Sequence, residues 1–200
     1  YCIDINNNNY EKIKKLNYIP VGLGDDKFNN HWLRDNTGDN ISRKNPYYGE
    51  YTFHYWLWKN DLQNIPENEW IGFCAYRRFW ASNKNNRNIN NLKDFFSEAP
   101  PEWEKYDVII GQNIYLKWKF SKLIKHGLRS LFHNPKYIFE KNRDIKFHFD
   151  SFHGYGNLDS AIKLLNDKDR EDFRKFTTSR NFYNRSSMFF CRSKKIMEEY

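Results

Sequence analysis

The sequence lacks the features that identify several common classes of protein directly. Its 200 residues contain no uninterrupted run of about 18 apolar residues, so no transmembrane helix is expected. There is no dinucleotide-binding fingerprint and no glycine-rich phosphate loop, and the histidines and cysteines lack the paired spacing of a zinc site. The pattern of a signal peptide is missing as well. A nucleotide or metal site, if there is one, must use residues that these motifs do not describe.

Cysteine is scarce, and its three copies cannot all pair with one another. Cys2, Cys74 and Cys191 each lie in an apolar, strand-like context. Disulfide frameworks use even numbers of cysteines in oxidising compartments, so we expect three buried, reduced thiols and a cytoplasmic protein. A thiol buried among apolar residues is inert, which argues against Cys74 as a nucleophile.

Acidic residues are outnumbered by basic ones, and the net charge is +8. This excess favours an anionic partner such as a nucleotide, a nucleic acid or a membrane surface, although an ordinary solvated surface explains it equally well. The length fits a single domain over residues 1–200. Because the chain stops inside an apparent helix, we expect it to be truncated at its C-terminal end.

Strand-like and helix-like segments alternate along the chain, which is typical of an α/β fold. Apolar strands are predicted at residues 1–5, 18–21, 71–74, 106–111 and 187–191, with helices at 10–16, 92–97, 158–176 and 193–200. Residues 83–91 and the aromatic stretch 147–156 are predicted to be loops.

The most informative stretch, residues 35–80, contains a polar loop, a helix and a strand in that order. Asn45 is predicted to be the N-cap of the helix and Pro46 its first residue. Aromatic and apolar residues recur at helical spacing up to Asn60 and should face the core.

The predicted strand at residues 71–74 leads directly to Tyr76, Arg77 and Arg78. Ligands of open α/β sheets bind at the carboxyl ends of strands, so these three residues are predicted to face a ligand. Guanidinium groups bind phosphate oxygens in a bidentate manner and stay charged at any working pH. The alternative is that the arginines brace the fold by pairing with carboxylates such as Glu50 or Asp39.

These segments resemble the hallmark of the capsular polysaccharide biosynthesis glycosyltransferase-like family. The matching residues are Asp35-Asn36-Thr37-Gly38-Asp39-Asn40-Ile41-Ser42 with Asn45, then Glu50-Tyr51-Thr52 with Tyr55-Trp56-Leu57-Trp58-Lys59-Asn60, then Gly72 with Tyr76-Arg77-Arg78-Phe79. Weaker matches follow over most of the remaining chain. Ala75 stands where the family usually has His, which leaves open whether the protein turns its substrate over or only binds it.

The resemblance implies a single GT-A-like (Rossmann-like) domain with a central, mostly parallel sheet flanked by helices. It also implies a nucleotide-sugar-dependent glycosyltransferase of capsular or other cell-surface polysaccharide synthesis, with a saccharide or lipid-linked acceptor. Donor binding is expected to involve the polar and charged residues of the central stretch, namely Asp35, Thr37, Asp39, Asn40, Asn45, Glu50, Tyr76, Arg77 and Arg78.

Such folds commonly hold a divalent metal on the donor diphosphate through an Asp-x-Asp motif near mid-domain, and this sequence has none there. The letters do occur at Asp167-Lys168-Asp169, but within a charged helix. Charge that develops on a leaving diphosphate needs cations, and Arg77 and Arg78 could supply them. We therefore predict no metal site, with Mg²⁺ or Mn²⁺ as the alternative.

A general base would have to be a carboxylate or a histidine near the acceptor hydroxyl. Asp150 and His153, with Glu50 behind them, are the predicted catalytic candidates. Two hypotheses compete with an active enzyme: a degenerate transferase that binds sugar nucleotide without turnover, and a nucleic-acid-binding module. No RNA-binding signature occurs, so no nucleic-acid partner is expected.

Residues 116–146 form a basic stretch that we predict to be an insertion within the domain, and residues 116–132 have the pattern of an amphipathic helix. The predicted apolar face consists of Leu116, Phe120, Leu123, Ile124, Leu128, Leu131 and Phe132, and the basic residues around it are Lys117, Lys119, Lys122, Lys125 and Arg129. This pattern is typical of a helix at an anionic membrane surface, which would bring the protein to the inner face of the membrane and to a lipid-linked acceptor. The alternative is an ordinary surface helix packed on the core.

Overall fold

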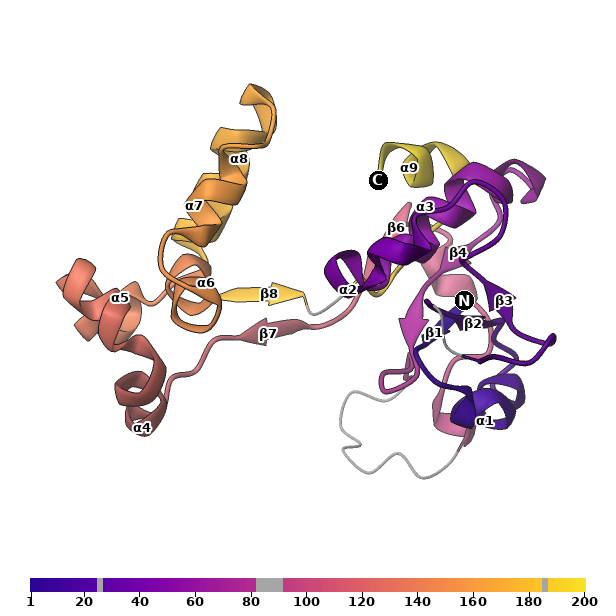
Figure 1. The fold of residues 1–200 in the computed structure, drawn as a ribbon, viewed down its shortest axis with the longest axis horizontal. Helices are drawn as coiled ribbons and strands as arrows, with labels where there is room; N and C mark the ends of the chain where they lie inside the picture. Colours follow the sequence, from indigo (N-terminus) through magenta and orange to yellow (C-terminus); the bar gives the residue numbers. More distant parts are fainter. Residues whose placement is uncertain (25–26, 82–91, 185–186) are drawn as a thin grey trace. The chain divides into compact units, whose positions relative to one another are not determined.

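The computed structural model describes residues 1–24, 27–81, 92–184 and 187–200 (Figure 1). The loop predicted at residues 83–91 lies outside the described residues. The chain divides into two compact units: unit 1 comprises Tyr1–Gly111 with Ser186–Tyr200, and unit 2 comprises Gln112–Arg185. The sequence predicted one domain with an insertion at residues 116–146, whereas unit 2 contains those residues and extends well beyond them.

The central sheet of unit 1 is parallel, with the strand order β3-β2-β1-β5. Its strands are β1 (Cys2–Asp4), β2 (Pro20–Gly22), β3 (Leu33–Arg34) and β5 (Cys74–Ala75). Strands β1 and β2 are buried throughout, as expected for a parallel sheet covered on both faces, and α1 (Tyr10–Lys15) makes the crossover between them. The predicted α/β fold with a central parallel sheet flanked by helices is confirmed.

A second sheet of unit 1 is antiparallel, with β9 (Phe189–Cys191) between β4 (Ile71–Gly72) and β6 (Val108–Ile110). The apolar run predicted as one strand at residues 71–74 is therefore divided, since β4 pairs with β9 and β5 pairs with β1. At the switch, the Phe73 N–H donates to the Phe189 carbonyl over 2.8 Å. Periodicity could not predict the switch because both sheets bury the run.

The helix predicted to begin at Asn45 is in fact two helices, α2 (Asn45–Tyr48) and α3 (Tyr51–Asn60). Gly49 ends α2 with φ +54° and ψ −129°, a conformation that favours glycine. Asn45 is not an N-cap: its Nδ2 donates to the Gly49 carbonyl over 3.0 Å and to Thr52 Oγ1 over 3.2 Å. This side chain ties the two helices together across the break.

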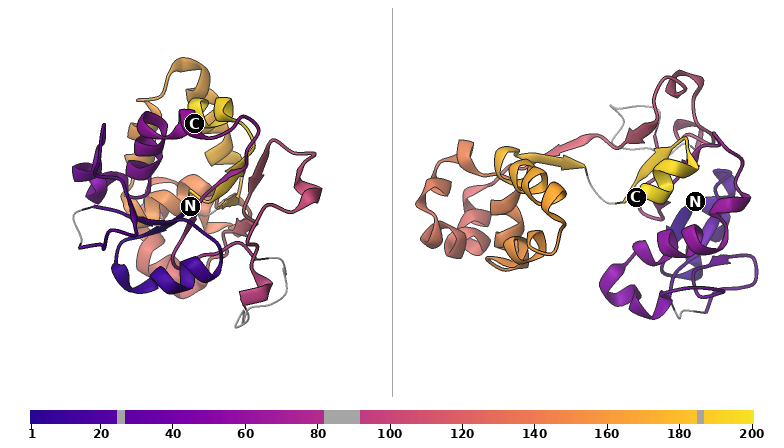
Figure 2. Two further views of the ribbon diagram at one scale, coloured as in Figure 1. Left: turned by 90° about the vertical axis from the view of Figure 1, so that its right-hand side faces the viewer. Right: turned by 90° about the horizontal axis from the view of Figure 1, so that it is seen from above.

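The main core of unit 1 joins α3 to both sheets and to α9 (Lys194–Glu199). Helix α3 buries the aromatic and apolar residues that its periodicity predicted, which are Phe53, Trp56 and Leu57. In both views of Figure 2, α9 (yellow) lies beside α3 (purple), and the His54 and Tyr200 rings are 5.4 Å apart. The three cysteines are free and buried, as predicted.

Unit 2 consists of a two-stranded ribbon with its helices gathered at one end (Figure 1). The antiparallel ribbon pairs β7 (Asn113–Tyr115) with β8 (Phe182–Asn184). The helices are α4 (Phe120–Lys122), a π turn (Leu123–Gly127), α5 (Leu128–His133), α6 (Ile145–His153), α7 (Asn157–Ile162) and α8 (Asp167–Ser179). Its small core contains Trp118, Leu123, Tyr137 and Phe147.

Several expectations for the helices are corrected. Most of the loop predicted at residues 147–156 belongs to α6, which is capped by Asp144 through a 2.7 Å hydrogen bond from the Phe147 N–H. The helix predicted at residues 158–176 is interrupted between α7 and α8. Short 3₁₀ turns occupy Asn7–Asn9, Ser42–Lys44, Leu62–Asn64, Leu92–Asp94, Pro101–Trp103, Pro135–Ile138 and Glu140–Asn142. Among the described residues, no helix has the length and apolarity needed to span a bilayer.

Candidate functional site

A hollow of about 490 Å³ lies at the carboxyl ends of three parallel strands of unit 1. Ile3 and Ile5 line it from the end of β1, Leu23 from the end of β2, and Ala75 from the end of β5. Helix α2 and the start of α3 complete its wall. This is the edge of an open α/β sheet where ligands are expected, so the parallel topology itself selects the hollow as the candidate site.

Arg77 and Arg78 border the hollow on a tight turn that follows β5. The Arg78 N–H donates to the Ala75 carbonyl over 2.8 Å, and the Tyr76 N–H donates to the Ile3 carbonyl over 2.9 Å, which fixes the turn to β1. Both arginines are exposed, and the Arg77 guanidinium stacks 4.9 Å from the Tyr76 ring centre. Within the described residues, no ion pair joins Arg77 to Glu50 or Asp39, two of the bracing partners considered from the sequence.

Aromatic side chains of α2 and α3 form the other border of the hollow. Tyr47 is 89% exposed, and Tyr48 and Tyr51 are each 52% exposed. None of the three was predicted as a site residue from the sequence, although Tyr47 and Tyr48 stand outside the core-facing periodicity of α3. Exposed rings beside cations provide surfaces for stacking a nucleobase or a sugar.

Glu50 contributes the carboxylate of the site. It is half-buried at the break between α2 and α3, and Ser187 Oγ donates to its Oε2. Ser187 comes from the far end of unit 1 in sequence, so only the fold could bring it there. The hydrogen bond fixes the orientation of the carboxylate beside the hollow.

Asp35 has a different environment from the one predicted for a donor-binding residue. Its carboxylate is fully buried and accepts hydrogen bonds from Thr52 Oγ1 over 2.6 Å and from the Gly24 N–H over 3.1 Å. Burial raises the pKa of Asp35, against the opposing effect of these hydrogen bonds. Asp35 holds the β2 loop to α3 and does not line the hollow.

The remaining residues of the predicted donor loop are held by hydrogen bonds within the loop or to α3. Thr37 Oγ1 accepts from Trp56 Nε1 over 3.0 Å, and Asp39 accepts from the Tyr55 hydroxyl over 3.2 Å. Asn60 bonds both the N–H and the carbonyl of Asp39. Asn40 accepts from Ser42 over 2.9 Å. Of the predicted donor-binding set, the hollow therefore gathers Asn45, Glu50, Tyr76, Arg77 and Arg78, but not Asp35, Thr37, Asp39 or Asn40.

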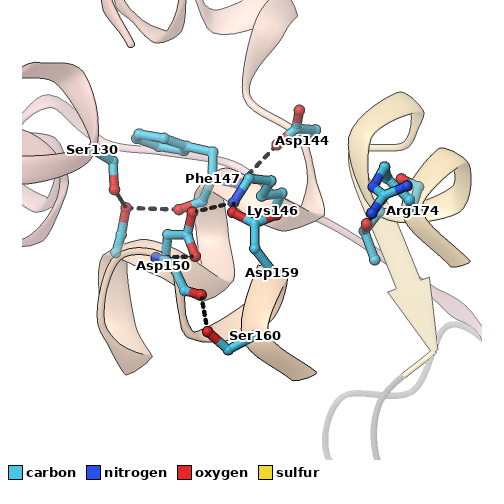
Figure 3. Close-up of polar contacts among 11 residues, drawn as sticks. Ser130, Asp144, Lys146, Phe147, Asp150, Asp159, Ser160 and Arg174 are labelled. Atoms are coloured by element: carbon cyan, nitrogen blue, oxygen red, sulfur yellow. Dashed lines mark hydrogen bonds and ion pairs between the residues drawn. The ribbon is translucent and has the colours of Figure 1, made fainter. Parts of the chain in front are cut away.

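The other two catalytic candidates, Asp150 and His153, lie on α6 in unit 2. Figure 3 shows Asp150 with its polar contacts. Lys146 Nζ sits 2.8 Å from the Asp150 carboxylate and 2.6 Å from that of Asp159. Burial tends to lower the pKa of Lys146, but the hydrogen bonds to both carboxylates outweigh it and leave the pKa raised. Asp150 is buried and also accepts from the Gly156 N–H over 3.3 Å, so its contacts are those of a structural ion pair. His153 is exposed, with its ring 4.5 Å from that of Phe149.

The five predicted membrane or acceptor residues, Lys117, Lys119, Lys122, Lys125 and Arg129, are all exposed in unit 2. The apolar residues between them do not form the single face predicted. Leu116 and Leu123 are buried, whereas Phe120 and Phe132 point outward with exposures of 76% and 83%.

No group of three or more His, Cys, Asp or Glu residues that could hold a metal ion occurs in the part of the chain that the structure describes. A larger hollow of about 810 Å³ in unit 1 offers an alternative ligand site. Its charged lining consists of Asp61, Glu69 and Glu98, with no Lys or Arg among the described residues. Because like charges repel, the acidic lining of this larger hollow does not suit a phosphate-bearing ligand. The smaller hollow, which Arg77 and Arg78 border, does suit one.

Comparison with known proteins shows the family of the chain, whose description names neither an activity nor capsular polysaccharide. A family model described as a domain of unknown function, DUF4422, matches residues 5–200. The chain belongs to the DUF4422 family. No curated protein matches it. One solved structure that this DUF4422 chain is similar to is described as the apo form of the bifunctional glycosyltransferase WbbM, with 20% identity and a TM-score of 0.37. The match covers 84% of this chain and 29% of the other, so the family member spans less than a third of that protein's length.

Proposed function

We propose that this DUF4422 protein is a nucleotide-sugar-dependent glycosyltransferase with its donor site in unit 1. One observation carries the proposal: the hollow at the carboxyl ends of the parallel strands is bordered by two exposed arginines, a fixed carboxylate and exposed tyrosines. These are the groups that a sugar joined to a nucleoside diphosphate requires, since it carries anionic, polar and aromatic parts.

Arg77 and Arg78 would bind the diphosphate. In glycosyl transfer, the bond between the anomeric carbon and the diphosphate oxygen breaks, and the electron pair leaves with the diphosphate. Guanidinium groups stabilise this growing negative charge most strongly if they are already in place. The turn anchored on β1 holds both groups beside the hollow, which supports a transfer that needs no metal; Mg²⁺ or Mn²⁺ remains the alternative to be tested.

Glu50 is the one of the three predicted catalytic candidates that lines the hollow. As a general base it would take the proton of the acceptor hydroxyl while the hydroxyl oxygen forms its bond to the anomeric carbon. The acceptor is a saccharide or a lipid-linked saccharide of capsular or other cell-surface glycan synthesis, and the protein acts in the cytoplasm, in part at the inner face of the membrane.

A second candidate function is donor binding without turnover. Ala75, which replaces the usual histidine of the family, lies in the lining of the hollow, where a methyl group can neither donate nor accept a proton. If the missing histidine were essential for glycosyl transfer, Glu50 could not catalyse the transfer alone, and the site would bind the donor without turnover.

The test is the affinity of the protein for a panel of uridine and guanosine diphosphate sugars, measured by calorimetry. We expect Arg77→Ala and Arg78→Ala each to weaken binding by about 10- to 100-fold, because each removes hydrogen bonds to a charged group. The control Lys14→Ala, an exposed cation on α1, should bind normally. Excess chelator should leave binding unchanged.

Turnover with a saccharide acceptor, followed by mass spectrometry, separates the two candidates. Glu50→Gln should keep donor binding and lose transfer if the protein is an enzyme. Donor binding by wild type without any transfer would favour the binding protein. Equal affinity in the arginine variants and wild type, or binding of random single-stranded RNA in place of nucleotide sugars, would refute the donor site. Loss of binding in chelator that Mn²⁺ or Mg²⁺ restores would refute the metal-free mechanism.

A further inference from the structure

The helical segment from α4 to α5 in unit 2 turns a row of large apolar side chains toward solvent. This outward row consists of Phe120, Ile124, Leu128 and Phe132, which are 76%, 47%, 46% and 83% exposed. Neither phenylalanine makes a ring contact with another described residue. Large exposed apolar side chains that recur on one short segment mark an interaction site.

The outward row is not needed for the packing of unit 2, because other residues of the same segment make the inner contacts. Leu123, Gly127 and Ser130 are buried. A Cβ atom on Gly127 would lie 3.2 Å from the Phe147 ring, which shows how closely the segment approaches α6. The inner face thus packs through Leu123 and two small residues, and the four residues of the outward row are left outside.

The π turn reduces the angular drift in the middle of the outward row. Residues four apart in an α-helix drift by about 40° around its axis, because the helix advances about 100° per residue. The turn at Leu123–Gly127 is wider than an α turn and takes up this drift. The π turn therefore keeps Ile124 and Leu128 close to one line, and Phe120 and Phe132 lie on either side of them along the segment.

Positive charge surrounds the outward row. Lys117, Lys119, Lys122, Lys125 and Arg129 are all exposed, and residues 108–139 contain no acidic residue. None of the five cations forms an ion pair with another described residue. A second copy of the chain is a poor occupant, since its row would bring five further cations against these five. An anionic lipid surface satisfies both the apolar row and its charges.

We infer that the outward row inserts into the interface of a bilayer that contains anionic lipid, with the five cations over the lipid headgroups. Each basic residue near such a surface adds a favourable increment, and inserted aromatic and aliphatic side chains add to it. The surface lies wholly in unit 2, so the inference does not depend on the donor site of unit 1. Donor affinity of the variants below should equal that of wild type.

Co-sedimentation of the full chain with vesicles tests the inference. Wild type should pellet with vesicles that contain phosphatidylglycerol and stay in solution with vesicles of phosphatidylcholine alone. Phe132→Ser should lose most of this binding, whereas Leu164→Ser, which changes a side chain 89% exposed elsewhere in unit 2, should retain it. The double variant Lys125→Gln/Arg129→Gln should partition roughly 30-fold more weakly. Its matched control, Lys168→Gln/Lys175→Gln on α8, removes the same charge and should bind nearly as wild type.

Three results would overturn the inference. Equal pelleting with neutral and anionic vesicles would show that charge does not contribute to binding. No pelleting with either kind of vesicle would show that the outward row does not dock on a membrane. Equal losses in the matched controls would show a general effect of net charge or apolarity. Concentration-dependent self-association that Phe132→Ser abolishes, without vesicle binding, would assign the row to a second copy of the chain.

Discussion

In unit 1, the burial of a charged residue determines whether it stabilises the fold or is available to a ligand. Asp35 is fully buried with two hydrogen-bond donors, an arrangement that satisfies a carboxylate within the fold. Arg77 is exposed on its turn beside the hollow, where its guanidinium can meet a ligand. Both belong to the same sequence hallmark. The hallmark therefore combines residues that build the site with residues that border it.

His54 predicts how stability depends on pH. Burial lowers the pKa of His54 to about 4, while an unfolded histidine has a pKa near 6.5. As the pH falls from about 6.5 toward 4, the unfolded chain takes up a proton that the folded protein excludes, so stability decreases by up to roughly 3 kcal/mol. The contribution of neutral His54 to the free energy of unfolding is fully present above about pH 6.5. Urea unfolding at about pH 7 and pH 5 measures the effect.

The comparison of variants isolates His54 from the other groups that titrate in this range. His54→Gln should lose most of the pH dependence between those two conditions. His31→Gln, which changes an exposed histidine of the same unit, should keep the wild-type dependence. An unchanged dependence in His54→Gln would contradict the prediction.

Among the elements, α3 links the core to the site. It buries Phe53, Trp56 and Leu57 in the core. It also holds the polar loop through hydrogen bonds from Trp56 Nε1 and Asn60 Nδ2. Gly38, with φ +56°, lies so close to Asn60 that a Cβ atom there would be 2.1 Å from its side-chain oxygen. The two best-matched parts of the hallmark thus contact each other, and the loop sets the position of the helix whose first turn borders the hollow.

The break between α2 and α3 gives a prediction for this element. Gly49→Ala should destabilise the protein by about 1–3 kcal/mol, because φ +54° with ψ −129° is unfavourable for a residue with a Cβ atom. No atom lies within 4 Å of the added Cβ, so the cost is conformational rather than steric. Donor affinity should also fall, since relief of the strain would move Tyr47 and Tyr48. Urea unfolding and calorimetry measure the two effects.

Gly111→Ala is the matched control for this change. Gly111 also has nothing within 4 Å of an added Cβ atom and has no positive φ. The free energy of unfolding of the Gly111→Ala protein should stay within about 0.5 kcal/mol of that of wild type. A Gly49→Ala protein as stable as this control would show that the break is not held by glycine's conformational freedom.

On the scale of the whole molecule, the division into two units separates the two proposed surfaces. Unit 1 carries the parallel sheet and the hollow, and unit 2 carries its own small core and the outward row. In unit 2, Lys146 between Asp150 and Asp159 joins α6 to α7 (Figure 3). A change to this cluster should act on the stability of unit 2 and not on ligand binding in unit 1.

Asp150→Asn tests that separation. It should lower the stability of unit 2 by roughly 1–3 kcal/mol, because a buried acceptor for Lys146 is weakened. Donor affinity and transfer should be preserved at temperatures where the variant is folded. Asp167→Asn, at an ion pair whose carboxylate is 93% exposed, should change stability by less than about 1 kcal/mol. Loss of transfer with unchanged stability would instead make Asp150 a catalytic residue.

Local patterns were sufficient to predict much of unit 1. Alternating apolar and amphipathic segments predicted the α/β fold, the apolar spacing of α3 predicted its buried face, and isolated cysteines in apolar contexts predicted free, buried thiols. The rule that ligands bind at the carboxyl ends of parallel strands also brought Tyr76, Arg77 and Arg78 to the candidate site. These features depend on periodicity and on residue type, which a sequence states directly.

Only the tertiary structure decided which polar residues border the hollow and which are used to build it. Asp35 and Arg77 are both charged residues of the same stretch of sequence. In the fold, Asp35 is buried and accepts hydrogen bonds from Gly24 and Thr52, whereas Arg77 is exposed to solvent. The division of residues 71–74 between two sheets, the contact of Ser187 with Glu50 and the outward direction of Phe120 and Phe132 likewise depend on partners distant in the chain. Long-range pairing sets burial, and burial determines whether a side chain serves the fold or remains available to a ligand.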